Sequence, residues 1–362
     1  MSNAVSILIF FLIFGLLVAF HEGGHFLIAK ANNIRVKEFT IGLGPQIFKK
    51  QRGETLYSVR LLPFGGACIF DGMLGAEEED EEGNPVPVDP EDVRAFPNAK
   101  VWSRIATVFA GPLFNFFLAY LIALVVVAFT PWDYPVISSF TEDSAAKEAG
   151  LLEGDLIVKI DRSKIFTATE ARLISQFNDG ETIRMTVERN GERLTIPFTP
   201  RYSKEDDRYY MGIYFGTYER LSGAQVPQYA WYAVRYYMTA TWRQLALLVR
   251  GRLGADALSG PVGMVQMVDE TYEVSKSYGG FQVLLSMLEL TLLLSVNLGI
   301  MNLLPIPALD GGRLLFLFLE VVRGKPIPPE KEGYVHLAGI VALVILMVFV
   351  LFNDIARMIH VG

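Results

Sequence analysis

The 362-residue chain is poor in cysteine, in basic residues and in charge generally. Its one cysteine, Cys68, excludes a disulfide framework within the chain. Acidic residues outnumber basic ones by 39 to 32, and no basic stripe offsets the net charge of −7, so nucleic acid is not an expected partner. Only 20% of residues are charged, against about 25% in soluble domains. This shortage argues against one large soluble globule and favours an integral membrane protein that carries a soluble domain.

Apolar residues are concentrated in four regions. The first has no charge from residue 4 to residue 20 and stays apolar to residue 29. It lacks the basic start of a signal peptide and is long enough to cross a bilayer, which takes about 20 residues. The other three regions are 105–130, 281–322, which prolines and glycines interrupt, and 335–352. The pattern predicts four transmembrane segments.

The segments between these regions have a different character. Residues 34–67 mix β-forming residues with glycine-rich turns and predict a β-hairpin. Residues 131–217 alternate apolar and polar residues between turns, which predicts a soluble α+β domain. Residues 226–250 combine aromatic residues with arginines, which is typical of a helix lying in the membrane interface. We therefore predict an α-helical polytopic membrane protein with parts 1–130, 131–217, 218–280 (an interfacial amphipathic linker) and 281–362.

Basic residues are placed asymmetrically around the predicted spans. Six follow the first span and three precede the fourth: Lys30, Arg35, Lys37, Lys49, Lys50, Arg52, Arg323, Lys325 and Lys331. By the positive-inside rule these loops are cytoplasmic. Four spans then place both termini and residues 131–280 outside the cytoplasm of a multi-pass protein of the plasma or inner membrane.

The first span ends in an H-E-x-x-H motif, which begins at His21 and ends at His25. On a helix the two histidines lie one turn apart on one face, so both imidazoles can bind one zinc ion. Glu22 would lie beside the metal, where it can take a proton from the attacking water and deliver it to the leaving amine. Such polar groups cost a few kcal/mol each at membrane depth unless they are paired or functional. The motif therefore predicts a catalytic zinc site.

A catalytic zinc ion needs a third protein ligand from elsewhere in the chain. Asp310 is the strongest candidate, because it is the only carboxylate between Glu289 and Glu320 and follows two helix-breaking prolines. Broken helix at membrane depth is tolerated where it is buried or lines a wet cavity. Alternatively, the aspartate caps the next helix. His336 and His360 are weaker rivals that lie near the predicted interfaces.

These motifs resemble those of the site-2 protease family of intramembrane zinc metalloproteases. The resemblance covers nearly the whole chain: H-E-x-x-H in the first span, N-x-x-P-x-P-x-x-D-G from Asn302 in the third, and a soluble insert between the second and third. It is nearest to the bacterial branch with a single PDZ domain that acts in regulated intramembrane proteolysis. It implies Zn²⁺ ligands at His21, His25 and Asp310, with Glu22 as the catalytic acid and base.

The resemblance also implies substrate contacts. Asn302 matches the family's asparagine ahead of the prolines, and Asn115 falls in a motif near the substrate path. The segment 42–66, with Gly42 and Gly44, is similar to a membrane-reentrant hairpin to which an unwound substrate can pair. We expect the strand that contains Val59 to form the open edge for this pairing. Residues 143–161 look like the most recognisable stretch of a PDZ domain, which would span 131–217. Its binding strand and carboxylate loop would lie near the end of the domain, at Met211, Gly212 and Ile213.

The implied activity is cleavage of the transmembrane segments of single-span membrane proteins, such as anti-sigma factors or remnant signal peptides. The expected partners are that substrate, the lipid bilayer and a peptide C-terminus at the PDZ-like domain. Two other functions remain open. One is a membrane-anchored zinc protease of soluble or lipidated peptides, and the other is a non-enzymatic zinc transporter or PDZ scaffold. A glutamate between the two histidines and an oxyanion-type asparagine favour an enzyme over the latter.

Overall fold

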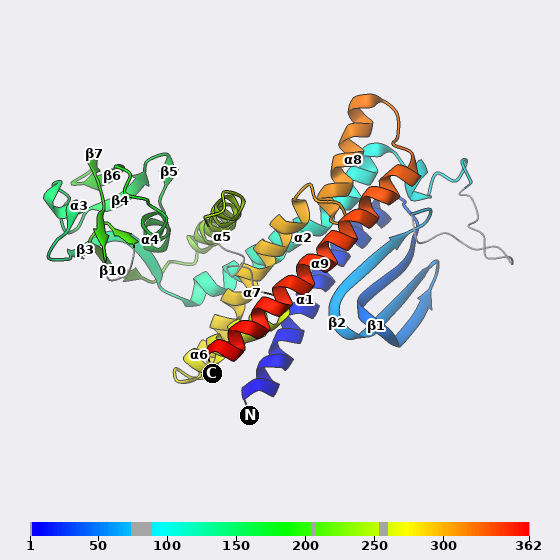
Figure 1. Cartoon of the computed structure of the whole chain (residues 1–362), viewed down its shortest axis with the longest axis horizontal. Helices are drawn as coiled ribbons and strands as arrows, with labels where there is room; N and C mark the ends of the chain where they lie inside the picture. Colours follow the sequence, from blue (N-terminus) through cyan, green and yellow to red (C-terminus); the bar gives the residue numbers. More distant parts are fainter. Residues whose placement is uncertain (1, 74–88, 205–207, 253–259, 362) are drawn as a thin grey trace. The chain divides into compact units, whose positions relative to one another are not determined.

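The computed structural model describes residues 2–73, 89–204, 208–252 and 260–361 (Figure 1). The chain divides into two compact units. The first unit combines Met1–Ile122 with Tyr237–Gly362, and the second is Ala123–Tyr236.

Long apolar helices form most of the first unit. Four of the described helices are long and apolar enough to cross a membrane, one for each apolar region of the sequence. They are α1 (Ser2–Ala31), α2 (Val101–Phe129), α7 (Gly280–Leu303) and α9 (Pro329–Val361). The shorter helices of this unit are η1 (Phe96–Asn98), α6 (Pro261–Lys276), which packs against α1, α7 and α9, and α8 (Asp310–Arg323).

The predicted hairpin is present as two long antiparallel strands, β1 (Val36–Arg52) and β2 (Thr55–Phe70). Residues such as Thr40 pair with both Ser58 and Ala67, which shows that each strand bends back on itself near its glycines. The register therefore gives four adjacent segments in the order 66–70, 36–41, 55–62 and 46–52. Residues 66–70 form one free edge of this small sheet.

The third apolar region is interrupted where the prolines predicted a break. Helix α7 ends at Leu303, and α8 begins at Asp310 after a short loop. Pro305 and Pro307 lack the N–H groups that a continuous helix would need in this loop. Its backbone satisfies itself through tight local bonds instead, such as Ile306 N–H to the Leu304 carbonyl at 2.7 Å.

The second unit is an α+β fold around one five-strand path. The sheet has the order β10-β3-β4-β6-β7, with β5 paired to β4, and a separate ribbon joins β8 to β9. The elements are β3 (Trp132–Phe140), α3 (Ala145–Glu148), β4 (Leu156–Ile160), β5 (Ser163–Lys164), α4 (Ala168–Gln176), β6 (Ile183–Arg189), β7 (Glu192–Phe198), β8 (Arg201–Ser203), β9 (Arg208–Tyr210) and β10 (Ile213–Glu219).

Apolar residues of alternating strand positions fill the core of this unit, with Ile137, Ile157 and Met185 almost fully buried. Burial alone would raise the pKa of Asp155, but hydrogen bonds from Arg189 and from the Leu152 N–H lower it below its ordinary value. Helix α5 (Val226–Val249) follows and carries the chain from the second unit to the first.

Candidate metal centre and active site

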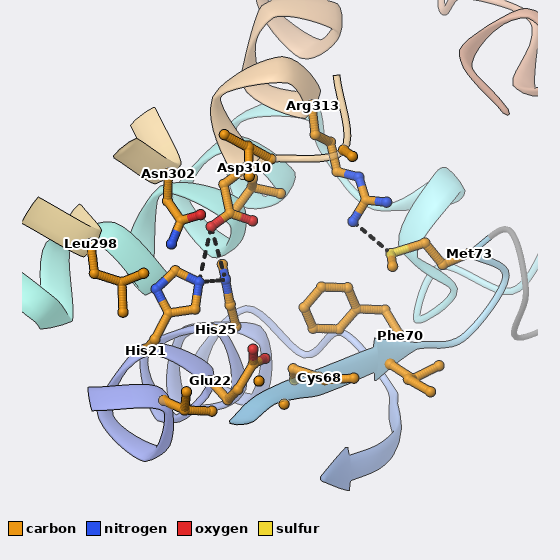
Figure 2. A pocket seen from close by; sticks show the side chains of 18 residues that line it. His21, Glu22, His25, Cys68, Phe70, Met73, Leu298, Asn302, Asp310 and Arg313 are labelled. Carbon is orange, nitrogen blue, oxygen red and sulfur yellow. Dashed lines mark hydrogen bonds and ion pairs between the residues drawn. The ribbon is translucent and has the colours of Figure 1, made fainter. Parts of the chain in front are cut away.

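Three polar side chains from distant parts of the sequence meet in the first unit. His21 and His25 come from α1, and Asp310 comes from the first turn of α8 (Figure 2). The three residues are the group of possible metal ligands found among the described residues. Asp310 makes no side-chain bond that caps α8, so the capping role left open by the sequence is not what the structure shows. Its carboxylate points at both histidines instead.

The distances between the candidate ligand atoms fit one tetrahedral zinc ion. Asp310 Oδ2 lies 3.1 Å from His21 Nε2 and 3.4 Å from His25 Nε2, and the two Nε2 atoms are 3.3 Å apart. Zinc bonds of about 2.0–2.1 Å in a tetrahedron separate ligand atoms by about 3.3–3.4 Å. Asp310 Oδ2 is also buried without a hydrogen-bond donor, as a metal ligand should be. The site therefore fits zinc with a fourth position left for water.

The Nδ1 atom of each histidine, which faces away from Asp310, has its own polar partner. His25 Nδ1 lies 2.9 Å from the Thr107 carbonyl, which can only accept, so the proton is on Nδ1 and Nε2 is free for a metal. His21 Nδ1 lies 3.0 Å from the amide of Asn115, whose Oδ1 has no partner. Turning the amide over places that oxygen against an Nδ1–H. Both histidines then present Nε2 to the same point.

Glycines allow the helices to close around this point. A Cβ on Gly111 of α2 would lie 2.2 Å from His25 Nε2 and 2.9 Å from a ring carbon of His21. A Cβ on Gly24 would lie 2.5 Å from the Ala110 carbonyl, whereas one on Gly23 would meet nothing within 4 Å. Gly24 and Gly111 therefore bring α1 and α2 to backbone contact, and the imidazoles occupy the space that a side chain at Gly111 would need.

Glu22 lies between the histidines and the hairpin (Figure 2). The backbone N–H of Cys68 donates to its carboxylate. A Cβ on Gly66 would lie 2.8 Å from Glu22 Cγ, so a glycine is needed where β2 passes this side chain. The hairpin thus both orients the carboxylate and closes that side of the site. Cys68 is itself buried but does not belong to the group of possible metal ligands.

A cavity of about 350 Å³ opens onto these groups. Its wall includes both histidines, Glu22, Asp310 and the edge segment 66–70. Asn302 also lines it and lies close to Asp310 and His21 (Figure 2). Arg313 enters from α8, and its guanidinium donates to Met73 Sδ at 3.1 Å. The sequence pattern did not single out Arg313, because an arginine in an amphipathic helix is common.

The remaining predicted residues lie elsewhere. Asn115 is fully buried behind His21 and does not line the cavity. Gly42 and Gly44 adopt positive φ angles of 93° and 87° in the bend of β1, also away from the cavity.

In the second unit, Met211, Gly212 and Ile213 line a separate cavity of about 440 Å³. Of the rival histidines, His336 accepts a bond from the Ala308 N–H and is not in the ligand group, and the side chain of His360 is outside the described part of the chain.

The sequence did not reveal what holds the ligands in place. Thr107 acts through its backbone carbonyl, which leaves no trace in residue type. Gly111 precedes Pro112 and Gly66 follows Gly65, and neither pattern indicates contact with a ligand side chain. Together these groups arrange two imidazoles, a carboxylate and a separate glutamate inside apolar helices. Such an arrangement defines a zinc metalloprotease of the membrane.

Comparison with known proteins agrees. The family model of peptidase family M50 matches residues 9–346. The regulator of sigma-W protease RasP of Bacillus subtilis is 33% identical, with 98% of this chain and 99% of that protein covered. A zinc metalloprotease of Bacillus licheniformis (34%) and a putative one of Clostridium acetobutylicum (32%) also match along 98% and 97% of this chain. The chain belongs to peptidase family M50, the site-2 protease family.

Proposed function

We propose that this zinc metalloprotease cleaves the transmembrane segments of single-span membrane proteins in regulated intramembrane proteolysis. Its substrates would include anti-sigma factors or remnant signal peptides. The name of the B. subtilis relative, a regulator of sigma-W protease, supports a protein that controls a sigma factor as one such substrate.

The origin of the metal ligands carries this proposal. His21 and His25 lie inside the candidate span Ala4–Ala31, and Asp310 follows the span Gly280–Leu303 after the proline break. A site built from such segments meets a substrate that is itself in the bilayer. A membrane-anchored protease of soluble peptides would instead draw its third ligand from a soluble segment.

The metal ligands, Glu22 and Asn302 together supply the groups that peptide hydrolysis needs. Bound zinc would supply Lewis-acid polarisation of the scissile carbonyl and acidify water. Glu22 takes the proton from the attacking water and passes it to the leaving amine. Asn302 faces the same space and can donate its amide N–H to the substrate carbonyl as negative charge develops there. Asn115 holds the ring of His21 rather than the substrate.

The free edge of the hairpin would hold the unwound substrate. A helical substrate must unwind before water reaches a carbonyl, which leaves backbone groups unpaired in the membrane. From the sequence, the position expected to form the open edge is Val59. This is wrong, because Val59 pairs with both Ile41 and Phe48 and is therefore an inner segment. The edge that lines the cavity is 66–70, and we assign strand pairing to it.

Native Cys68 allows this pairing to be tested without disturbing the fold. Single cysteines are scanned along a substrate span and cross-linked to Cys68 in the Glu22→Gln protein, with Cys68→Ala as control. An extended, paired substrate gives yields that alternate with a period of two residues. A period of three to four residues would mean that the substrate stays helical there and would refute the role of the edge.

The basic residues around the spans support an orientation in which the termini and the second unit lie outside the cytoplasm. In a Cys68→Ala background, a cysteine at exposed Glu153 should react with a membrane-impermeant reagent in intact cells. A cysteine at exposed Glu91, between the first two spans, should react only after permeabilisation. The reverse pattern would invert the orientation, and the active site would open toward the other side.

Two features of the second unit support a role as a PDZ-like peptide-binding domain. Strand β10 lies at one end of the sheet order, and a cavity between β10 and α4 is lined by Gly212, Ile213 and Arg172. A peptide strand could add to this edge and place its terminal carboxylate near Gly212. Binding of a fluorescent peptide to the full chain should then require a free C-terminus. Equal binding of the amidated peptide would exclude this recognition.

The direct test of the proposed activity is cleavage in proteoliposomes. Wild-type and Glu22→Gln proteins are compared on one single-span substrate, and zinc content is measured in both. We expect equal zinc and at least about a 10²–10⁴-fold slower cleavage by the variant, because it loses proton transfer but no ligand. A soluble copy of the cleavage sequence serves as the second substrate. If it were cleaved as fast as the membrane substrate, the intramembrane assignment would fail.

A further inference from the structure

The loop that delivers Asp310 contains a backbone turn that its own residues do not favour. Ala308, two residues before the ligand, has a φ of 77°. Residues other than glycine seldom adopt this left-handed backbone conformation, and it persists only where the surrounding structure imposes it. Ala308 also lines the active-site cavity. Whatever holds this turn therefore controls where the following carboxylate points.

Helix α9, drawn in red in Figure 1, contacts this turn at two points. The Ala308 N–H donates to His336 Nδ1 at 3.0 Å. One turn further along α9, a Cβ on Gly339 would lie 2.5 Å from both Cβ and the carbonyl oxygen of Pro307. Helix and loop are thus at backbone contact beside the hydrogen bond.

The surroundings of His336 determine which ring nitrogen accepts the hydrogen bond from the Ala308 N–H. Its Nε2 lies 3.5 Å from Glu332 Oε1, and only 14% of the side chain is exposed. A proton on Nε2 faces that carboxylate, which leaves Nδ1 as a lone-pair acceptor for the Ala308 N–H. The ring also lies against Phe316 of α8, with centroids 5.8 Å apart. The imidazole is therefore held between the loop, α8 and its own helix.

We propose that His336 is a positioning residue for the metal site. By accepting the Ala308 N–H it holds the left-handed turn that aims Asp310 at the two histidines, although α9 supplies none of the described residues that line the cavity. The proposal rests on Asp310 being a zinc ligand. It gives the last membrane span a task in the active site that its apolar sequence does not suggest.

The test compares replacements that differ in where they offer an acceptor. His336→Asn places an amide oxygen near the position of Nδ1, His336→Gln places it further out, and His336→Leu offers none. Zinc affinity is measured by chelator competition, and the visible spectrum of the cobalt-loaded protein reports ligand geometry. Tyr334→Leu, at a position of α9 that is 74% exposed, is the matched control.

We expect His336→Leu and His336→Gln to weaken zinc binding by about 10–100-fold, as removal of groups that orient metal ligands does elsewhere. The cobalt spectrum should change in both. His336→Asn should restore affinity to within about threefold, and Tyr334→Leu should match wild type. Wild-type affinity and spectrum in His336→Leu would overturn the proposal, and so would equal losses in the Asn and Gln variants.

Two further variants make the result unambiguous. In an Ala308→Gly background the left-handed turn is no longer disfavoured, so His336→Leu should cost less there. An undiminished cost would count against the proposal, and this background also serves if His336→Leu alone does not fold. Asp310→Ala tests the premise: unchanged zinc affinity in that variant would remove Asp310 from the site. A loss with Asp310→Ala but none with His336→Leu refutes only the positioning role.

Discussion

The two halves of the metal site are built by different means. His21 and His25 lie one turn apart on a continuous helix, so helical geometry alone brings their side chains to one face. Asp310 stands after a break between helices, beyond two prolines and a strained alanine. Its direction depends on groups from other helices. One half of the site is thus a local property of the sequence, whereas the other is a product of tertiary packing.

Removing one ligand from each half of the site should have the largest effect on zinc affinity. His25→Ala and Asp310→Ala should each lower zinc affinity by more than about 100-fold, since partners behind the ligands alone are worth about 10–100-fold. The measurement is competition with a chelator on purified protein. A much smaller loss for Asp310→Ala than for His25→Ala would mean that the two halves are unequal and that another group completes the site.

This difference also decides how much could be predicted. The long apolar helices and the hairpin follow from periodicity and composition, and the structure confirms both. The histidine pair follows from helical spacing, and the structure places the two Nε2 atoms 3.3 Å apart. Asp310 could be named as a candidate because it is an isolated carboxylate after prolines, but its approach to the histidines could not be derived. Asn115 was named as a substrate contact, but its place beside His21 could not be derived, and Thr107 gave no signal because it acts through its backbone carbonyl.

The sequence-based prediction of the hairpin's edge at Val59 was wrong for a related reason. Alternation along 57–62 indicates a strand but does not tell which neighbours it has. Because both strands bend at glycines, the segment containing Val59 is enclosed on both sides and 66–70 becomes the edge. Pairing between distant segments is set by packing against α1, where Gly66 passes Glu22.

Replacing the residues that contact the second ring nitrogen of each histidine should have an intermediate effect on zinc affinity. The two replacements distinguish a side-chain contact from a backbone contact. Asn115→Leu should weaken zinc binding by about 10–100-fold, because His21 loses its partner. Thr107→Val should leave zinc binding unchanged, since His25 contacts the carbonyl and the Thr107 hydroxyl is buried without a partner. Titration with zinc distinguishes the two. A loss in Thr107→Val equal to that in Asn115→Leu would show general damage to the helices rather than loss of orientation.

Replacing the adjacent glycines of the motif, Gly23 and Gly24, should have the smallest effect, which is on the free energy of unfolding. Gly23→Ala is a matched control for Gly24→Ala. Gly24→Ala places a methyl group 2.5 Å from the Ala110 carbonyl and should destabilise the protein by about 1–3 kcal/mol. Gly23→Ala meets no atom within 4 Å and should be neutral or gain up to about 1 kcal/mol of helix stability. Thermal unfolding in detergent measures both. Equal melting temperatures for the two variants would show that α1 and α2 are not in backbone contact.

X-ray absorption at the zinc edge reports directly which ligands the two halves of the site contribute to the metal. The Glu22→Gln protein is suitable, since it keeps every proposed ligand. We predict a first shell of nitrogen and oxygen at about 2.0–2.2 Å, with the outer-shell signal of two imidazoles. Asp310→Ala should alter the oxygen contribution and leave the imidazole signal. A sulfur scatterer at about 2.3 Å would make Cys68 a ligand, and either that or the signal of three imidazoles would rule out the ligand set His21, His25 and Asp310.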